Sequence, residues 1–527
     1  MPGSEPNQFA LRAALARPDT YPHHPATVER RETHISWVFL AGRRAYKLKK
    51  PLVLDFLDYG TPERRRAMCE EEVRLNRRLA PQLYLGVRGV RMTETGVELT
   101  SADDPRAVEF LVEMRRYDER HTLAAALNRG QLSREQIRAV GERLARFHAS
   151  APPARDAEAL GRAVERRFED NVHELLALVE QRDEIGRVLA LERFVHAYIT
   201  GHAATFAARA SQGCVREGHG DLRAEHVLLE GGVQIVDCVE FDRRLRELDV
   251  ADDLAFLIFD LIAQDGEAVA EVLLEAYRDA GGDAGEDSLI AFYAAYRALV
   301  RAKVALLRAA QLPADGAERA AAAARARELI LVSERFAWQA RRPLLIVVCG
   351  LPASGKSLLA ASLAESAGLP HGSSDEIRKQ LAGIPATQRA PAHSYSPEWN
   401  VRTYEALARH ARECLSARGG AILDATFRHA VDRRAFTAAL GSAAPLLFIE
   451  CLAPGRVLAE RAAGRERELG RISDADAAVV QAELGSWEPL DEVPAAAHVS
   501  LRTDRPLEHV VGDVMALLDQ RLLSSGA

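Results

Sequence analysis

Residues 344–357 contain glycine, lysine and serine at a spacing that is typical of a phosphate-binding loop. They read Leu-Leu-Ile-Val-Val-Cys-Gly-Leu-Pro-Ala-Ser-Gly-Lys-Ser, an apolar strand followed by a glycine-rich loop and a helix start. In such a loop, backbone N–H groups and the helix dipole cradle phosphates, a lysine reaches the outer phosphates, and a serine hydroxyl ligates Mg²⁺. The alternative, a plain glycine-rich turn, does not explain the strand before it and the helix after it. The predicted contacts to ATP and Mg²⁺ are Gly350, Ser354, Gly355, Lys356 and Ser357.

Lysine is rare in this chain. Of 69 basic residues only six are lysine: Lys47, Lys49, Lys50, Lys303, Lys356 and Lys379. The chain uses arginine wherever a positive charge suffices, so a remaining lysine can mark a place that needs a compact ammonium. One of the six belongs to the loop above, and three cluster at 47–50. For Lys50 and Lys303 we expect no such role.

The composition is that of a globular protein with more than one domain. The chain has 527 residues, 48% of them hydrophobic, and a net charge of −7, so nothing indicates a global affinity for nucleic acid. Its six cysteines form no Cys-x-x-Cys pair, which argues for a reducing cytoplasm and against a zinc site or disulfide framework. The longest apolar run is too short to cross a membrane, so we expect a cytoplasmic protein with no membrane partner.

The pattern of elements predicts two domains. Residues 1–340 read as a bilobal α+β domain, with a small lobe over about 1–115 and a helical large lobe over about 116–340. Residues 341–527 alternate strands and helices, which predicts an α/β domain with a parallel sheet. Two strands joined by a turn at 41–44 and a charged helix over 61–80 are expected in the small lobe.

A second set of residues that could transfer phosphate interrupts the helical lobe near 215–242. Gly218-His-Gly-Asp221 is followed by His226, which is a possible metal ligand, and then by two short apolar strands and Asp237. This resembles the catalytic and metal-binding loops of the aminoglycoside phosphotransferase branch of the protein-kinase-like superfamily. The resemblance implies that Asp221 orients or deprotonates an acceptor hydroxyl and that Asp237 holds Mg²⁺, with Glu240 a weaker metal candidate.

The same resemblance extends upstream and has two departures. It implies that Lys47 pairs with phosphate and that Glu72 is its carboxylate partner, with Lys49 and Glu71 as close rivals. His226 occupies a position where the family carries a metal-binding Asn; an imidazole there is a softer ligand, so a second Mg²⁺ is in question. A glycine-rich turn over the phosphates is also missing.

The C-terminal domain carries further candidates after its phosphate loop. Asp375 and Arg378 lie three residues apart, so on a helix they face one way, and Asp424 ends a short strand, where parallel-sheet enzymes place site residues. Arg461 and Arg465 lie four apart on a predicted helix, and their alternative interpretation is a solvated helical face.

This set is similar to the P-loop kinases that include polynucleotide kinases, gluconate kinases and the zeta-toxin group. The similarity implies that Asp375 activates the acceptor hydroxyl and Arg378 binds an anionic group of the acceptor. It implies lid roles for Arg461 and Arg465, which would neutralise developing charge, and we expect Asp424 near the metal.

Both halves therefore predict ATP- and Mg²⁺-dependent phosphoryl transfer. We expect a bifunctional kinase that acts on hydroxyl groups of small molecules or of a polynucleotide 5′ end. Two alternatives remain: an inactive kinase-like domain that senses a ligand and gates the C-terminal P-loop NTPase, or a nucleotide-binding scaffold. The sequence leaves the acceptors, the coupling of the two sites and the oligomeric state open.

Overall fold

A computed structural model of the chain describes residues 8–54, 57–94, 96–155, 157, 160–313, 315–441, 445–465 and 485–524. Contacts divide the chain into two compact units. Unit 1 comprises Met1–Arg166 and Ala204–Arg297, and unit 2 comprises Arg167–Ala203 and Ala298–Ala527. Two helical stretches that precede residue 341 thus belong to the same compact unit as the parallel-sheet region. The domain boundary at 341 itself stays a prediction.

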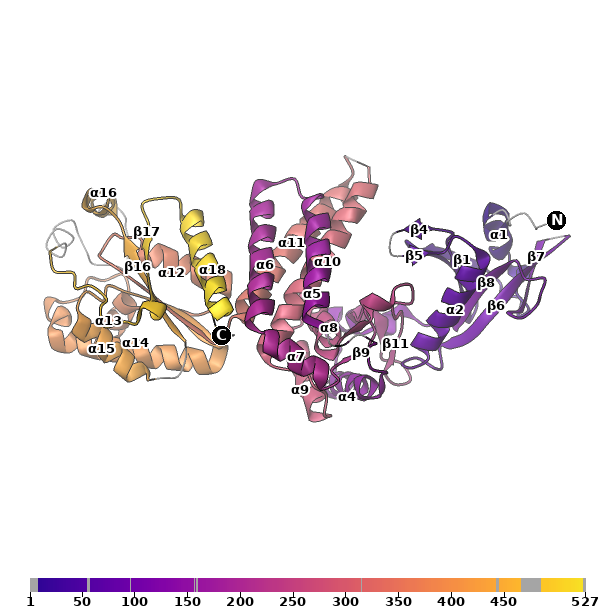
Figure 1. Ribbon diagram of the computed structural model, residues 1–527, viewed down its shortest axis with the longest axis horizontal. Helices are drawn as coiled ribbons and strands as arrows, with labels where there is room; N and C mark the ends of the chain where they lie inside the picture. Colours follow the sequence, from indigo (N-terminus) through magenta and orange to yellow (C-terminus); the bar gives the residue numbers. More distant parts are fainter. Residues whose placement is uncertain are drawn as a thin grey trace. The chain divides into compact units, whose positions relative to one another are not determined.

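Unit 1 begins with a small lobe built on an antiparallel sheet of order β1-β2-β3-β8-β6-β7 (Figure 1). The hairpin expected at 41–44 is present, and Gly42 at φ 62° makes its turn. Helix α2 starts where expected because the Thr61 hydroxyl accepts the Arg64 N–H and Pro62 occupies the first turn. The elements of this lobe are α1 (Gln8–Leu15), β1 (Val28–Glu32), β2 (Ser36–Ala41), β3 (Arg44–Lys49), β4 (Val53–Leu54), β5 (Leu57–Asp58), α2 (Pro62–Asn76), β6 (Tyr84–Thr93), β7 (Gly96–Ser101) and β8 (Glu109–Arg115).

The large lobe of unit 1 is helical and is interrupted by short strands, as expected. β9 pairs with β12, and β10 pairs with β11 around Gly231 and Gly232, both at positive φ. These short strands carry the loops that hold Asp221 and Asp237. The elements are α3 (Leu123–Asn128), α4 (Arg134–Ser150), α7 (Ala203–Ser211), β9 (Val215–Glu217), β10 (Val227–Leu228), β11 (Gln234–Ile235), β12 (Glu247–Asp249), α8 (Val250–Ile262), α9 (Glu267–Asp279) and α10 (Asp287–Gln311), whose end lies in unit 2.

Unit 2 holds a five-stranded parallel sheet of order β14-β15-β13-β16-β17. Its central strand β13 is buried throughout and leads into the phosphate loop. Residues 371–373 form the short strand β14, which pairs in parallel with the edge of β15. The strands are β13 (Leu344–Cys349), β14 (His371–Ser373), β15 (Gly420–Ala425), β16 (Leu446–Leu452) and β17 (His498–Arg502).

The helices of unit 2 cover this sheet and extend beyond it. Trp338, on α11, belongs to the same hydrophobic cluster as Leu344 of β13, Leu363 of α12 and Val514 of α18. The sheet core therefore begins before residue 341. The helices are α5 (Leu160–Leu176, which starts in unit 1), α6 (Arg182–Gly201), α11 (Ala317–Ala340), α12 (Lys356–Ala367), α13 (Ser374–Leu381), α14 (Pro397–Arg418), α15 (Ala430–Leu440), α16 (Gly455–Arg465) and α18 (Leu507–Ser524).

The C-terminal helix α18 packs on α6, and a glycine permits the contact. A Cβ at Gly201 would lie 2.0 Å from the Leu522 carbonyl oxygen, which is far inside van der Waals contact. Nearby, Arg341 and Asp519 form a buried ion pair, and the Arg341 guanidinium lies 4.3 Å from the Phe194 ring centroid. These contacts tie the last helix to helices from the middle of the chain.

We predict that Gly201→Ala destabilises unit 2 by about 1–3 kcal/mol, because the added methyl forces α6 and α18 apart. The matched control is Gly186→Ala on the same helix. A Cβ at Gly186 meets nothing within 4 Å, so its helix propensity should stabilise by about 0.5–1 kcal/mol. Thermal unfolding of the two variants measures the difference, and equal melting temperatures would contradict the packing described.

Candidate active sites

Two lysines on β3 meet carboxylates from other segments of unit 1. Lys47 Nζ lies 2.7 Å from Glu72 Oε1 and 2.7 Å from Asp237 Oδ1. Lys49 Nζ lies 2.8 Å from Glu72 Oε2 and 2.5 Å from Glu240 Oε1. The two lysines share one face of the strand because they are two residues apart. The structure thus brings together Lys47, Glu72 and Asp237, and adds a second pair beside them.

Burial distinguishes the two lysines. The Lys47 side chain is 17% exposed, whereas that of Lys49 is 1% exposed. The Tyr59 hydroxyl donates to Glu240 Oε1 at 2.7 Å. Its ring centroid lies 5.1 Å from Lys49 Nζ, so Tyr59 is part of the buried environment of this lysine. Only Lys47 is placed to reach an added phosphate without breaking a fully buried ion pair.

The charges of this cluster stabilise one another. Burial opposes ionisation, but the Asp237 and Glu72 carboxylates raise the pKa of Lys47 well above its usual value. Burial likewise works against the Asp237 carboxylate, yet the Lys47 ammonium holds its pKa below the usual range. For Glu72 the two lysines outweigh burial and lower the pKa. All of these groups are therefore charged at neutral pH.

The His-Gly-Asp loop is shaped by a buried carboxylate. Asp253 accepts the backbone N–H groups of His219, at 2.6 Å, and of Gly220, at 2.9 Å. His219 Nε2 donates to the Val236 carbonyl at 2.8 Å, so the loop before Asp221 is fixed to the residue before Asp237. This bonding positions the two predicted functional carboxylates relative to each other.

Asp221 and His226 lie together at the end of this loop with Arg223. The Arg223 Nε–H donates to both carboxylate oxygens of Asp221, at 3.1 and 3.2 Å. His226 is 8% exposed, and burial lowers the pKa of its imidazole. Arg223, which the sequence analysis did not single out, is a cation in direct contact with the predicted catalytic carboxylate. Its position two residues after Asp221 was the available signal.

The oxygen donors of Asp237 fit a Mg²⁺ ion. Its side chain is 42% exposed, and carboxylate oxygens are the ligands this ion prefers. Within the described residues no group of three or more His, Cys, Asp or Glu stands ready to hold a metal by itself. A metal at Asp237 would therefore share its coordination with nucleotide phosphates and water, as Mg²⁺ in phosphoryl-transfer sites does.

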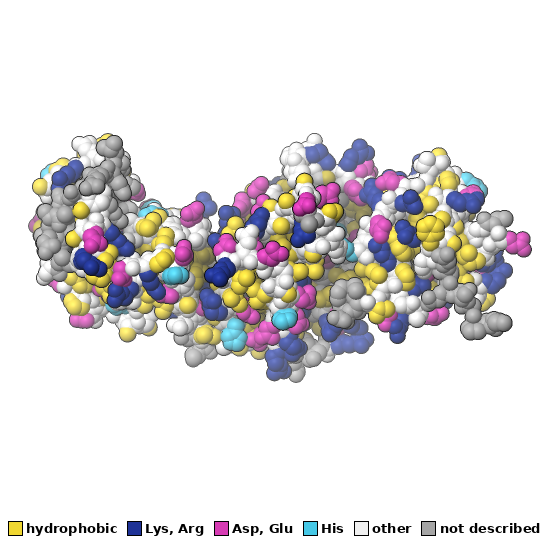
Figure 2. All heavy atoms as spheres, turned by 90° about the horizontal axis from the view of Figure 1, so that it is seen from above, with side chains coloured by type: hydrophobic (Ala, Val, Ile, Leu, Met, Phe, Trp, Pro, Cys, Tyr) yellow, Lys and Arg dark blue, Asp and Glu magenta, His cyan; other side chains and the backbone are white. Residues whose placement is uncertain are grey.

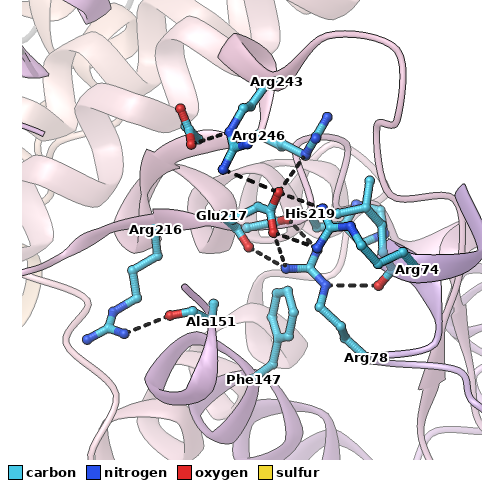
Figure 3. A network of polar contacts seen from close by, with 12 residues as sticks. Arg74, Arg78, Phe147, Ala151, Arg216, Glu217, His219, Arg243 and Arg246 are labelled. Atoms are coloured by element: carbon cyan, nitrogen blue, oxygen red, sulfur yellow. Dashed lines mark hydrogen bonds and ion pairs between the residues drawn. The ribbon is translucent and has the colours of Figure 1, made fainter. Parts of the chain in front are cut away.

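Glu217 joins helix α2 to the strand that precedes the His-Gly-Asp loop (Figure 3). The side chain of this carboxylate is 2% exposed, and its ion pairs include Arg74 at 2.8 Å and Arg246 at 3.3 Å. Arg78 donates to the backbone carbonyls of Glu217 and Gly218. Glu71, the rival of Glu72, faces this cluster and pairs with Arg74 and Arg246. The helix that carries Glu72 is thereby fixed to the strand and backbone that lead into the His-Gly-Asp loop.

We predict that Glu217→Gln destabilises the protein by about 3 kcal/mol or more, because it removes the buried carboxylate of a charge cluster and leaves the buried Arg246 guanidinium with Glu71 alone. Glu70→Gln, on helix α2, to which Glu217 is paired, is the control. Glu70 forms an exposed pair with Arg66, so its loss should cost roughly 0.5 kcal/mol or less. Urea denaturation compares the two, and a Glu217 variant as stable as the control would refute the structural role.

In unit 2 the phosphate loop has the backbone form that its sequence predicts. Gly350 and Gly355 lie at φ 141° and 91°, and a Cβ at Gly350 would lie 2.7 Å from the Cys451 carbonyl oxygen. Lys356 begins helix α12. The Ser354 hydroxyl is buried and has no hydrogen-bond partner among the described residues, which suits a loop that awaits phosphate oxygens.

Ser357 and Asp424 bring two oxygen ligands together beside this loop. Ser357 Oγ donates to Asp424 Oδ1 at 3.4 Å, and His371 Nε2 lies 3.3 Å from Asp424 Oδ2. Asp424 lies on β15 next to β13, so it reaches the loop from the neighbouring strand. A serine hydroxyl and a carboxylate are suitable donors for Mg²⁺, so the residues fit the predicted metal.

The two predicted lid arginines have different outcomes. Arg461 donates to the Ser354 carbonyl at 3.4 Å and to the Thr503 carbonyl at 2.7 Å. The Thr503 hydroxyl also donates to Ser354 O, at 2.5 Å. Arg461 and Thr503 thus support the phosphate loop through its backbone. The Arg465 side chain lies outside the described residues. Thr503 was missed, although it directly follows a parallel strand, where ligands commonly bind.

Asp375 and Arg378 lie on α13, which follows β14. Asp375 is in the first turn and partly exposed. Arg378 is 5% exposed; it donates to the Ser394 carbonyl at 2.5 Å, and its guanidinium lies 4.8 Å from the Tyr395 ring centroid. Its Nε has no hydrogen-bond partner among the described residues. The Asp432 carboxylate interacts with this guanidinium electrostatically, and the unsatisfied Nε–H can donate to a bound anion as well.

Comparisons with known proteins agree with the two halves. Residues 41–292 match the phosphotransferase enzyme family, and residues 345–490 match an AAA domain. These matches, with the folds described, define a phosphotransferase enzyme with an aminoglycoside-phosphotransferase-like domain and a P-loop kinase-like domain.

The chain is 35% identical over 482 residues to the uncharacterized protein Rv2004c of Mycobacterium tuberculosis (strain H37Rv). The matched region covers 88% of this chain and 92% of that protein. A protein of Mycobacterium bovis matches to the same extent. The chain belongs to the family of these proteins.

Among solved structures, a gluconokinase from Sinorhizobium meliloti is 25% identical with a TM-score of 0.25, covering 35% of this chain and 95% of its own. A choline/ethanolamine kinase family protein from Mesorhizobium loti is 17% identical with a TM-score of 0.37, covering 61% of this chain and 95% of its own. Within the described ranges no helix is both long and apolar enough to cross a membrane.

Proposed function

We propose that the protein is a bifunctional kinase, in which each domain transfers the γ-phosphoryl group of ATP, with Mg²⁺, to a hydroxyl acceptor. The observation that carries the N-terminal half is the position of Lys47, 2.7 Å from both Glu72 and Asp237. A cation for the phosphates and a carboxylate for the metal then lie side by side, as phosphoryl transfer requires.

In the N-terminal site the residues have separate tasks. Lys47 neutralises nucleotide phosphates, Glu72 orients Lys47, and Asp237 supplies oxygen to Mg²⁺, which would offset the phosphate charge when bound. Asp221 accepts the proton of the acceptor hydroxyl or orients that hydroxyl.

In the C-terminal site the phosphate loop, Lys356 and Ser357 hold the nucleotide, and Asp424 completes the ligand set for Mg²⁺. Asp375 is the proposed base, and Arg378, whose buried Nε–H has no partner among the described residues, favours an acceptor with an anionic group. On the face drawn in Figure 2, acidic and basic side chains interleave. We therefore favour small anionic hydroxyl compounds over a polynucleotide end as acceptors.

A second candidate function follows from the contact of His226 with the loop of Asp221. Because His226 stands where the resemblance implies a metal-binding Asn, the N-terminal domain could bind nucleotide without transferring phosphate and could gate the C-terminal site. The following variants separate these two functions.

We expect Lys356→Ala to lower C-terminal transfer by about 10²-fold or more, because a charge-stabilising group is lost. In that background, Asp221→Ala should abolish the remaining, N-terminal transfer while ATP binding persists. The measurement is transfer from labelled ATP to a panel of hydroxyl compounds, with isothermal titration for binding. Equal transfer with and without Asp221 would leave the gating function instead.

We further expect Asp375→Asn to abolish C-terminal transfer with nearly unchanged ATP affinity, because an amide keeps the size but accepts no proton at neutral pH. Arg378→Ala should raise the KM of the acceptor more than that of ATP. If Asp375→Asn weakens ATP binding, Asp375 belongs to the metal shell and not to the acceptor side.

A further inference from the structure

Arg223 occupies the space between the predicted catalytic carboxylate and His226. Its Nε–H is bonded to Asp221, its NH2 group lies 3.1 Å from His226 Nε2, and its NH1 group pairs with Glu225. The Arg223 side chain is 15% exposed, so the guanidinium is held inside the site and is not a surface charge.

The hydrogen bonds assign the state of the His226 ring. A guanidinium has donors only, so Nε2 of His226 must accept from Arg223. Nδ1 lies 2.8 Å from the Asp221 carbonyl oxygen and must donate to it. His226 is therefore a neutral imidazole with both nitrogens engaged, and its single lone pair already faces a cation. It offers nothing to a second metal ion.

The guanidinium has capacity left for a ligand. Arginine carries five N–H donors. The contacts described use the Nε–H and one N–H each of NH1 and NH2, which leaves one donor on each terminal nitrogen. The contact to Glu225 is also replaceable, because the Glu225 side chain is 55% exposed. A cation with free donors thus stands next to Asp221.

We propose that Arg223 supplies the positive charge that a second divalent ion would otherwise supply, and that the N-terminal site works with one Mg²⁺, held at Asp237. This rests on the proposed phosphotransfer at that site. In that reaction the acceptor oxygen forms a bond to the γ-phosphorus, the bond from the γ-phosphorus to the β,γ-bridging oxygen breaks, and ADP leaves with that electron pair. The acceptor proton passes to the Asp221 carboxylate, and the two free N–H groups of Arg223 bind oxygens of the phosphoryl group in transit.

The ion count tests this without measuring activity. Full-length protein with a non-hydrolysable ATP analogue is titrated with Mn²⁺, and free Mn²⁺ is followed by electron paramagnetic resonance. Mn²⁺ ions bound at the phosphate loop of unit 2 are counted equally in the unmodified chain and in Asp237→Ala, so they cancel in the comparison. We expect Asp237→Ala to lose one bound Mn²⁺ per chain. A loss of two ions, or of none, would overturn the proposal.

Kinetics in the Lys356→Ala background provide the second test. Arg223→Gln should lower kcat by about 10²-fold with the KM for ATP changed less than about threefold, since the lost charge acts mainly during transfer. Arg223→Lys should recover part of the loss. Arg244→Gln, at an 80%-exposed arginine of the same unit, is the control. An Arg223→Gln variant with unchanged kcat would overturn the proposal. If the Lys356→Ala protein transfers no phosphate at all, the proposed N-terminal kinase activity is wrong. The Mn²⁺ count then decides whether the N-terminal site holds one divalent ion.

Discussion

The N-terminal site depends on one carboxylate that two lysines share. Glu72 pairs through one oxygen with Lys47 and through the other with Lys49. On one side of Glu72, Lys47 pairs with Asp237. On the other side, Lys49 pairs with Glu240, which also accepts a hydrogen bond from the Tyr59 hydroxyl. Negative and positive groups thus alternate along a row. Each buried charge in this row is tolerable only because its neighbour has the opposite sign. The row joins β3, α2 and the segment after β11, and so it fixes the proposed phosphate-binding Lys47 and the proposed metal ligand Asp237 relative to each other.

In the C-terminal site, backbone groups of the loop after β13, more than charged side chains, form the predicted phosphate-binding surface. Glycines at positive φ let the loop after β13 turn tightly, and the close approach of Cys451 leaves no room for a side chain at Gly350. Arg461 and Thr503 then hold the loop by its carbonyl groups. The positive end of α12 adds to this arrangement. The two domains therefore prepare for phosphate in different ways, one with ion pairs and one with N–H groups.

Arginines and lysines have different structural roles in this chain. Arginines connect elements: Arg65 with Glu109, Arg209 with Asp249 and Arg297 with Asp252 are buried pairs between segments distant in sequence. The planar guanidinium suits such ties because it bonds in several directions at once. Lysines 47, 49 and 356 instead stand where a compact charge meets carboxylates or the phosphate loop. Arg223 is the arginine that we place among the functional groups.

The sequence alone predicted much of the fold, because periodicity and local turn chemistry determine elements. The apolar strand before the phosphate loop and the hairpin turn at Gly42 are where the pattern placed them. The phosphate loop was also predictable, since all its parts lie within fourteen consecutive residues.

Tertiary structure decided what depends on residues far apart in the chain. Nothing in the local pattern distinguishes Lys47 from Lys49, and only the burial around Tyr59 and Glu240 does so. The short strand β14 needed β15 beside it. Helix α6 belongs with α18 because a glycine permits their contact, not because of any boundary signal. The engagement of His226 by Arg223 likewise depends on the folded loop, since hydrogen bonds between side chains require positions that spacing along the sequence does not specify.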